Sequence, residues 1–297
     1  MTHKSLMQRF SAFDAAVYLI MFFVLSVLMY PLWYVLMASV SDVARVYENP
    51  LLLLPRGFNL LSYDRIIQNS DIWSSYKNTL LYTVAGVTIN IIMTVLGGYA
   101  LSRSDFYGRN VFTFIMVFTM FFNGGLIPTY LIIKNMRLLN TFWVMVIPNA
   151  IATYYVILAR TFFQTRIPHE LQESAKIDGC ANFRMLVKVV LPLSIPFISV
   201  IVLFYAMAHW NSYFQALIYL NDRKRWPLQL LLREILVQAQ MDNMQEAFIY
   251  EGLSDRVMVR EGLKYSTVVV ASVPLLVVYP FLQRFFKEGI LVGALKG

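Results

Sequence analysis

Charged side chains are scarce in this sequence, and their scarcity excludes an ordinary soluble domain. Asp, Glu, Lys and Arg together make up 14% of the 297 residues, whereas hydrophobic residues make up 58%. Average soluble domains carry roughly a quarter charged residues. The net charge of +8 comes from dispersed basic residues, with no aromatic-interleaved stripe that would indicate nucleic-acid binding. The composition therefore indicates an integral membrane protein.

Groups that bind metals or nucleotides are also few. The single cysteine, Cys180, excludes an internal disulfide and a multi-cysteine metal site, and we interpret it as a small residue in a tight turn. The three histidines, His3, His169 and His209, lack the spacing of a zinc site. The sequence also lacks G-x-x-x-x-G-K-S/T, the loop that cradles nucleotide phosphates. We therefore expect no cofactor and no metal in this chain.

Long apolar runs dominate the rest of the sequence. Six runs contain no Asp, Glu, Lys or Arg and reach the length of about 20 residues that a helix needs to cross a hydrocarbon core. The predicted spans are 15–41, 78–102, 110–133, 138–159, 193–221 and 265–283. Six runs in succession favour spanning helices over apolar core helices, and the first is too long for the h-region of a secretory signal. We predict an all-α membrane protein with six transmembrane helices in a single domain, residues 1–297.

Ionisable side chains are nearly missing from the predicted spans. His209 lies within a span, and no Asp, Glu, Lys or Arg does. Carriers driven by protons or sodium usually place ionisable groups at membrane depth, so the sequence argues against ion coupling. Two glycine pairs, Gly97-Gly98 and Gly124-Gly125, could imitate the helix breaks of transporters, but we favour close helix packing or a turn.

Charge sets the orientation only weakly. With six spans, the 25 Lys and Arg residues divide almost evenly between the two sides of the membrane. The positive-inside rule applies best to short loops, and the long segment 221–264 holds many of the basic residues on one side. The balance therefore tilts slightly toward a cytoplasmic N-terminus, with external loops at 42–77 and 221–264 and segment 166–192 inside.

Segment 166–192 predicts two short helices between two apolar runs. Pro168 suits a helix start, and Gly179 can close the first helix by adopting a positive φ. The second helix carries an apolar stripe that we expect to be buried, and Pro192 interrupts it. That stripe consists of Phe183, Leu186, Val187 and Val190. On these physical grounds alone, a helix pair lying on the lipid surface is an open alternative.

The same segment resembles the E-A-A-x-x-x-G loop, followed by L-P, of permease subunits in ATP-binding-cassette importers. The matching positions are Glu173, Ser174, Ala175, Asp178, Gly179, Leu191 and Pro192. The resemblance implies a cytoplasmic loop of coupling helices that seats in a cleft of the ATP-hydrolysing subunit. Glu173 would make polar contacts there, and Gly179 would permit the turn between the helices. Ser174 and Cys180 depart from the Ala residues of the family but keep the side chains small.

Two further stretches resemble sugar permeases related to the maltose transporter. "HWNSYFQALIYLND", from His209 to Asp222, is similar to their W-N-x-F/Y pattern. Trp210, Asn211 and Tyr213 would offer an aromatic face and an amide to a sugar ring and its hydroxyls, although interfacial belt aromatics are the alternative. His209 is a further candidate for the path. The tail "RFFKEGILVGALKG" resembles the glycine-rich end that reaches the ATPase dimer interface, which implicates Gly293 and Lys296.

The stretch "FFNGGLIPTYLIIKNMRLLNTFWVMVIPNAI", residues 121–151, resembles a subgroup of these permeases associated with acidic oligosaccharides such as aldouronates and alginate-type chains. Asn123 near the end of the third predicted span would be a candidate path position. Tyr154 and Tyr155 in the fourth span would be two more. Helix packing explains these three residues equally well.

The resemblance implies a type I importer permease in the bacterial cytoplasmic (inner) membrane, with both termini cytoplasmic. Its partners would be a second, homologous permease, two ATPase subunits that bind ATP and Mg, an extracytoplasmic sugar-binding protein and membrane lipid. The chain itself would not be an enzyme. One alternative is an integral membrane transferase, but Asp42, Glu48, Asp64 and Asp71 show no catalytic spacing. Another is a permease for amino acids or peptides, against which the Trp210-Asn211 stretch argues.

Overall fold

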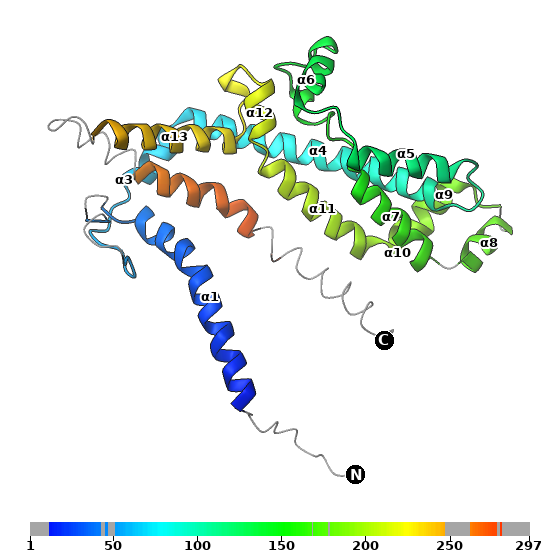
Figure 1. Cartoon of the computed structure of the whole chain (residues 1–297), viewed down its shortest axis with the longest axis horizontal. Helices are drawn as coiled ribbons and strands as arrows, with labels where there is room; N and C mark the ends of the chain where they lie inside the picture. The colour runs from blue at the N-terminus through cyan, green and yellow to red at the C-terminus, as the bar shows by residue number, and fades with distance from the viewer. Residues whose placement is uncertain are drawn as a thin grey trace. The chain divides into compact units, whose positions relative to one another are not determined.

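The computed structural model describes residues 12–42, 45–46, 51–167, 169–177, 179–246, 262–277 and 280. Within these residues every regular element is a helix, as the sequence predicts. Contacts divide the chain into two compact units, drawn from residues 1–68 with 235–270 and from residues 69–234 with 271–297. Figure 1 labels the helices of both units.

The first unit contains α1 (Ala12–Ser39), an apolar helix of 28 residues that covers most of the predicted span 15–41. It is long enough to cross a membrane, and its apolar side chains are largely exposed, as expected for a surface that meets lipid. Near its end, the Tyr63 hydroxyl of α3 (Leu61–Gln68) donates to Ser39 Oγ at 2.8 Å. The small core beside this contact consists of Ala38, Val46 and Leu52.

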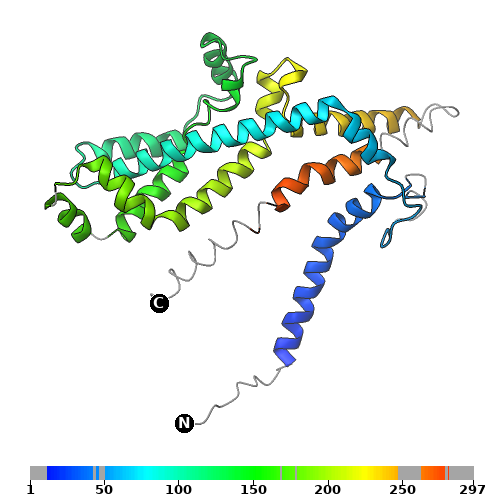
Figure 2. The same ribbon diagram turned by 180° about the vertical axis from the view of Figure 1, so that it is seen from behind.

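The longest helix of the second unit is α4 (Ser70–Ser102), and the side chain of Asn69 caps its first turn. Its 33 residues extend for about 50 Å, which exceeds the hydrocarbon core of about 30 Å. It contains the whole predicted span 78–102. Figures 1 and 2 show it as one unbroken cyan helix, along which α7 (Thr153–Arg166) and α11 (Ile195–Trp210) pack.

Two glycines allow these helices to approach closely. A Cβ on Gly98 would lie 2.6 Å from the Cβ of Ala159 on α7 and 3.1 Å from the backbone N of Arg160. A Cβ on Gly86 would overlap the imidazole ring of His209 on α11. Close helix packing, which we favoured from the sequence, is therefore what Gly98 provides. The crossings of α4 with α7 and α11 depend on the absence of these two Cβ atoms.

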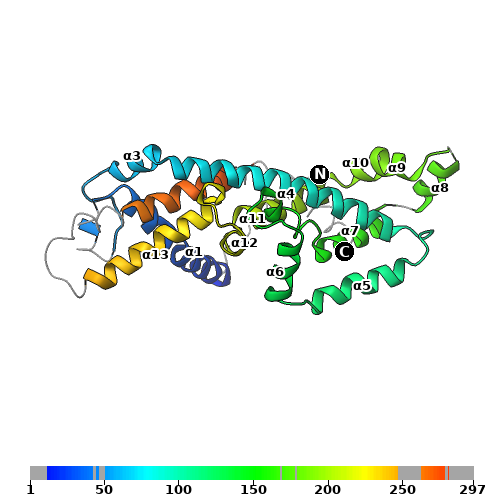
Figure 3. The same ribbon diagram turned by 90° about the horizontal axis from the view of Figure 1, so that it is seen from above.

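Two of the predicted runs are bent. The helices α5 (Arg109–Phe121) and α6 (Leu126–Asn135) meet at 115°, so the predicted span 110–133 is interrupted, and Figure 3 shows α6 turning away from α5. Gly125 makes this turn with a φ of +79°, a conformation that L side chains rarely adopt. A second bend, of 84°, separates Asn182–Leu193 from α11. The length of an apolar run does not require that the helix be straight.

The predicted span 138–159 differs most from the structure. Phe142–Met145 form a 3₁₀ turn, and α7 begins only at Thr153 and continues to Arg166. Pro148 disfavours helical geometry in the residue before it, and side chains of the turn are drawn into a buried core instead. The members of that core include Tyr82, Val144, Met145, Val146, Ala216 and Leu230.

The last two predicted spans are also only partly helical in the described residues. Within the predicted span 193–221, α11 ends at Trp210 and a break follows it. The helix Gly262–Val277 covers part of 265–283, and the remainder lies outside the described residues apart from position 280. The described residues contain two helices able to cross a membrane by length and composition, or four if each bent pair is one span. The remaining elements of this part of the chain are α12 (Phe214–Tyr219), η3 (Arg223–Arg225) and α13 (Leu228–Glu246).

Candidate functional site

A polar cavity of about 300 Å³ lies in the second unit, between α4, the start of α7 and α11. None of the ten residues that line it is charged, although it is surrounded by apolar helices. Seven of the ten carry an amide, hydroxyl or imidazole group. The polar residues are Asn90, Asn149, Tyr155, Tyr205, His209, Ser212 and Gln215.

Hydrogen bonds fix the side chains on one wall of this cavity. Asn90 Nδ2 donates to the carbonyl of Asn149, so Asn90 Oδ1 is left to accept from His209 Nε2 at 2.7 Å. This arrangement assigns the proton of a neutral His209 ring to Nε2 and leaves Nδ1 as an acceptor. Thr94 and Tyr205 pair through their hydroxyls at 2.7 Å. Because Asn90 is 1% exposed and His209 6% exposed, these pairs tie α4 to α11 where water is scarce.

Aromatic rings form another part of the lining. The ring of Tyr155 lies edge-on to that of Tyr205, with centroids 4.8 Å apart, and stacks on Phe204 at 6.1 Å. Tyr154 contacts the Tyr155 ring, but it does not line the cavity. The cavity therefore combines a flat aromatic surface with neutral donors and acceptors, which suits the apolar faces and hydroxyls of a sugar ring.

The structure separates the predicted path residues. Tyr155 and His209 line the cavity, whereas Trp210 is buried and donates from Nε1 to the Ala271 carbonyl at 3.2 Å. Asn211 lies in the break after α11 and donates to the Met207 carbonyl. The remaining two predicted positions, Asn123 and Tyr213, do not line this cavity. Asn123 accepts from the Gly125 N–H in the α5–α6 turn, and the Tyr213 ring lies 6.0 Å from the guanidinium of Arg233.

Sequence reasoning missed five of the polar residues that line the cavity, namely Asn90, Asn149, Tyr205, Ser212 and Gln215. A signal for some of them is present in the sequence. Asn90 and Thr94 are four residues apart in an apolar run, and Tyr205 and His209 repeat that spacing on the other helix. Polar residues at this spacing share one face of a helix, which indicates that the two polar faces meet.

The predicted coupling segment contains the helices α8 (His169–Ile177) and α9 (Asn182–Met185), with Gly179 between them. The φ of Gly179 is +70°, which confirms the expected turn, and nothing lies within 4 Å of the place where its Cβ would be. Glu173 and Ser174 are exposed on α8. The backbone of Ala175 belongs to α8, whereas Asp178, Gly293 and Lys296 lie outside the described residues.

Of the four apolar residues that we expected to be buried on the second helix, only two are buried. Leu186 and Val190 are buried, but Phe183 is 70% exposed and Val187 is also exposed, so the expectation for these two is wrong. Val187 lies in a π-helical turn over Leu186–Val190, which rotates its side chain relative to an α-helix, whereas Phe183 precedes that turn in α9. Met185 takes a buried position instead. The half-buried thiol of Cys180 packs against the same core, as a small residue beside the turn.

Known proteins resemble the chain over nearly its full length. The family described as "binding-protein-dependent transport system inner membrane component" matches residues 5–292. The polygalacturonan/rhamnogalacturonan transport system permease protein YtcP of Bacillus subtilis (strain 168) is 40% identical over 96% of this chain and 98% of its own length. Protein LplC of the same organism is 36% identical over 90% of this chain and 89% of its own.

A solved structure has the same fold. It is the crystal structure of a bacterial ABC transporter involved in the import of the acidic polysaccharide alginate. One of its chains matches with a TM-score of 0.81 and 31% sequence identity, over 94% of this chain and 99% of that one. The family resemblance first indicated by segment 166–192 is thereby confirmed. The chain belongs to the family of inner-membrane components of binding-protein-dependent transport systems.

Proposed function

We propose that this chain is one of two different permease subunits of an ATP-driven importer of acidic, uronate-containing oligosaccharides. Its family consists of membrane transport components and not of enzymes. Two relatives, at 40% and 31% identity, belong to systems for polygalacturonan/rhamnogalacturonan and for alginate. Partner ATPases would bind ATP and Mg, and an external binding protein would deliver the sugar.

The observation that carries the sugar part of this proposal is the polar cavity between α4, α7 and α11, and the acidic class rests on the two relatives. Its amide, phenol and imidazole groups can exchange hydrogen bonds with sugar hydroxyls, and Tyr155 offers a ring for stacking. The lining is uncharged, so it would recognise hydroxyls and not hold a uronate carboxylate tightly. A surface that must release each sugar unit is better served by such weak, neutral contacts than by an ion pair.

The coupling segment supports the second half of the proposal. Ile177 is 86% exposed and Phe183 70% exposed, although both are large and apolar. A cleft in a partner ATPase would cover these side chains, and Glu173 would add a polar contact beside them. In this proposal α8 and α9 are cytoplasmic, both termini are cytoplasmic, the chain has six spans, and loops 42–77 and 221–264 face outward. The tail residues Gly293 and Lys296 would reach the ATPase as well.

Substrate class is tested by uptake. The chain is reconstituted in proteoliposomes with its second permease, ATPases and binding protein, and ATP-dependent uptake of labelled oligogalacturonate is compared with that of a neutral malto-oligosaccharide. We expect uptake of the acidic sugar only. Tyr155→Ala should weaken uptake by roughly two- to tenfold, the value of one aromatic contact. Tyr154→Ala is the matched control, because Tyr154 does not line the cavity.

Coupling is tested in the same complex. Glu173→Lys reverses a charge on the exposed face of α8, and Gly179→Pro forbids the φ of +70° between the helices. We expect both variants to abolish the stimulation of ATP hydrolysis by sugar-loaded binding protein. If the native chain purifies without ATPases and neither change affects activity, α8 and α9 are a lipid-surface pair. Equal uptake of the neutral sugar would instead overturn the proposed substrate class.

A further inference from the structure

A buried arginine lies where α4 ends. Arg103 is the first residue after the helix and is only 6% exposed. Its guanidinium contacts three segments of the chain. On the loop that follows, Nε and Nη2 donate to the two carboxylate oxygens of Asp105 at 2.9 and 2.7 Å. Nη1 donates to Gln172 Oε1 on α8 at 3.3 Å and lies 3.7 Å from Met185 Sδ on α9.

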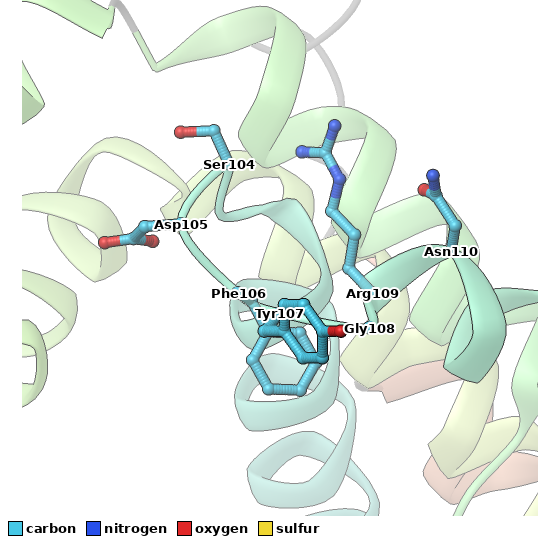
Figure 4. Close-up of a pocket in the computed structure, with 7 residues that line it drawn as sticks. All are labelled: Ser104, Asp105, Phe106, Tyr107, Gly108, Arg109 and Asn110. Carbon is cyan, nitrogen blue, oxygen red and sulfur yellow. The ribbon is translucent and has the colours of Figure 1, made fainter.

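The loop Ser104–Asn110 is shaped to hold the Asp105 carboxylate against this guanidinium. Gly108 turns the loop with a φ of +80°, and Arg109 Nη1 donates to the Arg103 carbonyl at 3.3 Å. Figure 4 shows the side chains of Asp105 and Arg109 extending to different sides of the loop. The two arginines therefore have different tasks. Only a planar guanidinium can form the two parallel bonds to the carboxylate and still donate to Gln172.

Other contacts connect the same end of α4 to the neighbouring helices. The Tyr99 hydroxyl donates to the Asn182 carbonyl, the first residue of α9, at 3.3 Å. Gln164 Nε2 of α7 donates to the Ser102 carbonyl at 3.4 Å. These bonds fix α9 and α7 to α4. The Gln172 side chain joins α8 to the same end of α4 through its contact with Arg103.

We propose that Arg103 is the positioning residue that joins the coupling segment to α4. Asp105 fixes the guanidinium at the end of α4. The contacts of the same guanidinium with Gln172 and Met185 connect it to α8 and α9, so that it moves with these helices. A displacement of α8 by a partner would then move the end of α4. Asn90 lies on the same continuous helix, about 20 Å from Arg103, and would move with it. This inference rests on the proposed function, because it assumes that a partner ATPase moves α8.

The test uses the full transporter complex in nanodiscs and measures the ratio of stimulated to basal ATP hydrolysis. Arg103→Gln removes the guanidinium, and Gln172→Ala removes only its contact on α8. Both should lower the ratio by about fivefold or more, the lower end of typical coupling between sites. Arg109→Gln is the matched control, since Arg109 belongs to the same loop and bonds to the Arg103 backbone, and its ratio should not change.

A distance measurement distinguishes positioning from general loss of structure. Spin labels are placed at Tyr107→Cys and Glu170→Cys, both exposed positions, in a Cys180→Ser background. The distance distribution should be narrow in the parent and should broaden with Gln172→Ala. Gln172→Glu should keep the narrow distribution, because a carboxylate at that position can still accept from the Arg103 guanidinium.

Each outcome decides one question. If the native complex shows no stimulation by sugar-loaded binding protein, the proposed function fails. If the native complex is stimulated but Gln172→Ala leaves both the ratio and the label distances unchanged, the role of Arg103 is overturned. Should Arg103→Gln fail to assemble, Gln172→Ala and Gln172→Glu still give the decision.

Discussion

The polar cavity and the coupling segment use polar side chains in opposite ways. In the cavity, Asn90, His209, Thr94 and Tyr205 are buried and bond to one another. On α8, Glu173 and Ser174 are exposed together with large apolar side chains. The first region is completed by the packing of the chain itself, whereas the second presents a surface that another molecule would complete. Substitutions should therefore affect stability first in the cavity region and activity first in the coupling segment.

The largest loss of stability should come from Gly98→Val. Its side chain would enter the space of the Ala159 Cβ and the Arg160 backbone, neither of which can rotate away. We expect a cost of about 3 kcal/mol, at the upper end for overpacking, seen as loss of monodisperse protein and a lower denaturation temperature in detergent. Gly97→Ala is the control, because it meets only the Val156 side chain at 3.3 Å. Equal behaviour of the two variants would contradict the close crossing.

Asn90→Leu should have the next largest effect. It leaves the His209 Nε2–H and the Asn149 carbonyl without their partner in a buried site. The expected cost is about 1–2 kcal/mol, because hydrogen bonds between membrane helices are of modest strength. Thr88→Val serves as the control, since the Thr88 hydroxyl bonds to its own helix at Val84. Thermal denaturation of both variants measures the difference, and equal denaturation temperatures would count against a supporting role for Asn90.

Arg223→Gln should cost less, below about 1 kcal/mol. Arg223 forms ion pairs with Asp71 at the start of α4 and with Glu234 on α13, but its side chain is half exposed. Water and salt screen such pairs. Denaturation at low and high salt should show that the small deficit disappears as ionic strength rises. A large deficit that salt does not alter would mean that this network is structural.

Ile177→Asp should have the smallest effect on stability and a large effect on activity. The side chain of Ile177 is almost fully exposed at the end of α8, so a charge there leaves the fold intact. We expect an unchanged denaturation temperature together with loss of stimulated ATP hydrolysis in the assembled complex. Normal stimulation would remove the contrast between the two regions, because the exposed face of α8 would then have no functional partner.

Residue patterns predict the helices of this chain well where one apolar run corresponds to one continuous helix. The ranges 15–41 and 78–102 agree with α1 and α4, which continue through Pro31 in the first run and through Gly86, Gly97 and Gly98 in the second. The run 110–133 contains Asn123 and two glycines, and the run 138–159 contains Pro148. Counting apolar residues does not register those turn signals. The π-turn over Leu186–Val190 has no comparable signal, which is why the exposure of Val187 was missed.

The candidate site is harder to predict because its residues are distant in sequence. His209 and Tyr155 were found by residue type, but Asn90 lies 119 positions from its partner His209. A lone asparagine in an apolar run becomes informative only when the helix opposite to it is known. Trp210 was also chosen by residue type, and the structure buries it with Nε1 donating to the Ala271 carbonyl, so its role in the sugar path stays a prediction. The family motif identified the transporter before any of these contacts could.

The uninterrupted length of α4 has a mechanical consequence. One rigid rod carries the Asp71–Arg223 pair at one end, the Asn90–His209 contact in its middle and Arg103 just beyond its other end. Because α4 has no break, a tilt or rotation of one end also tilts or rotates the other end. Because coupling between binding free energies is reciprocal, a ligand that shifts α4 from one end changes the affinity of a ligand at the other end by the same factor as the second changes that of the first. In the proposed importer, sugar binding on one side of the membrane and nucleotide binding to a partner on the other would both act on α4.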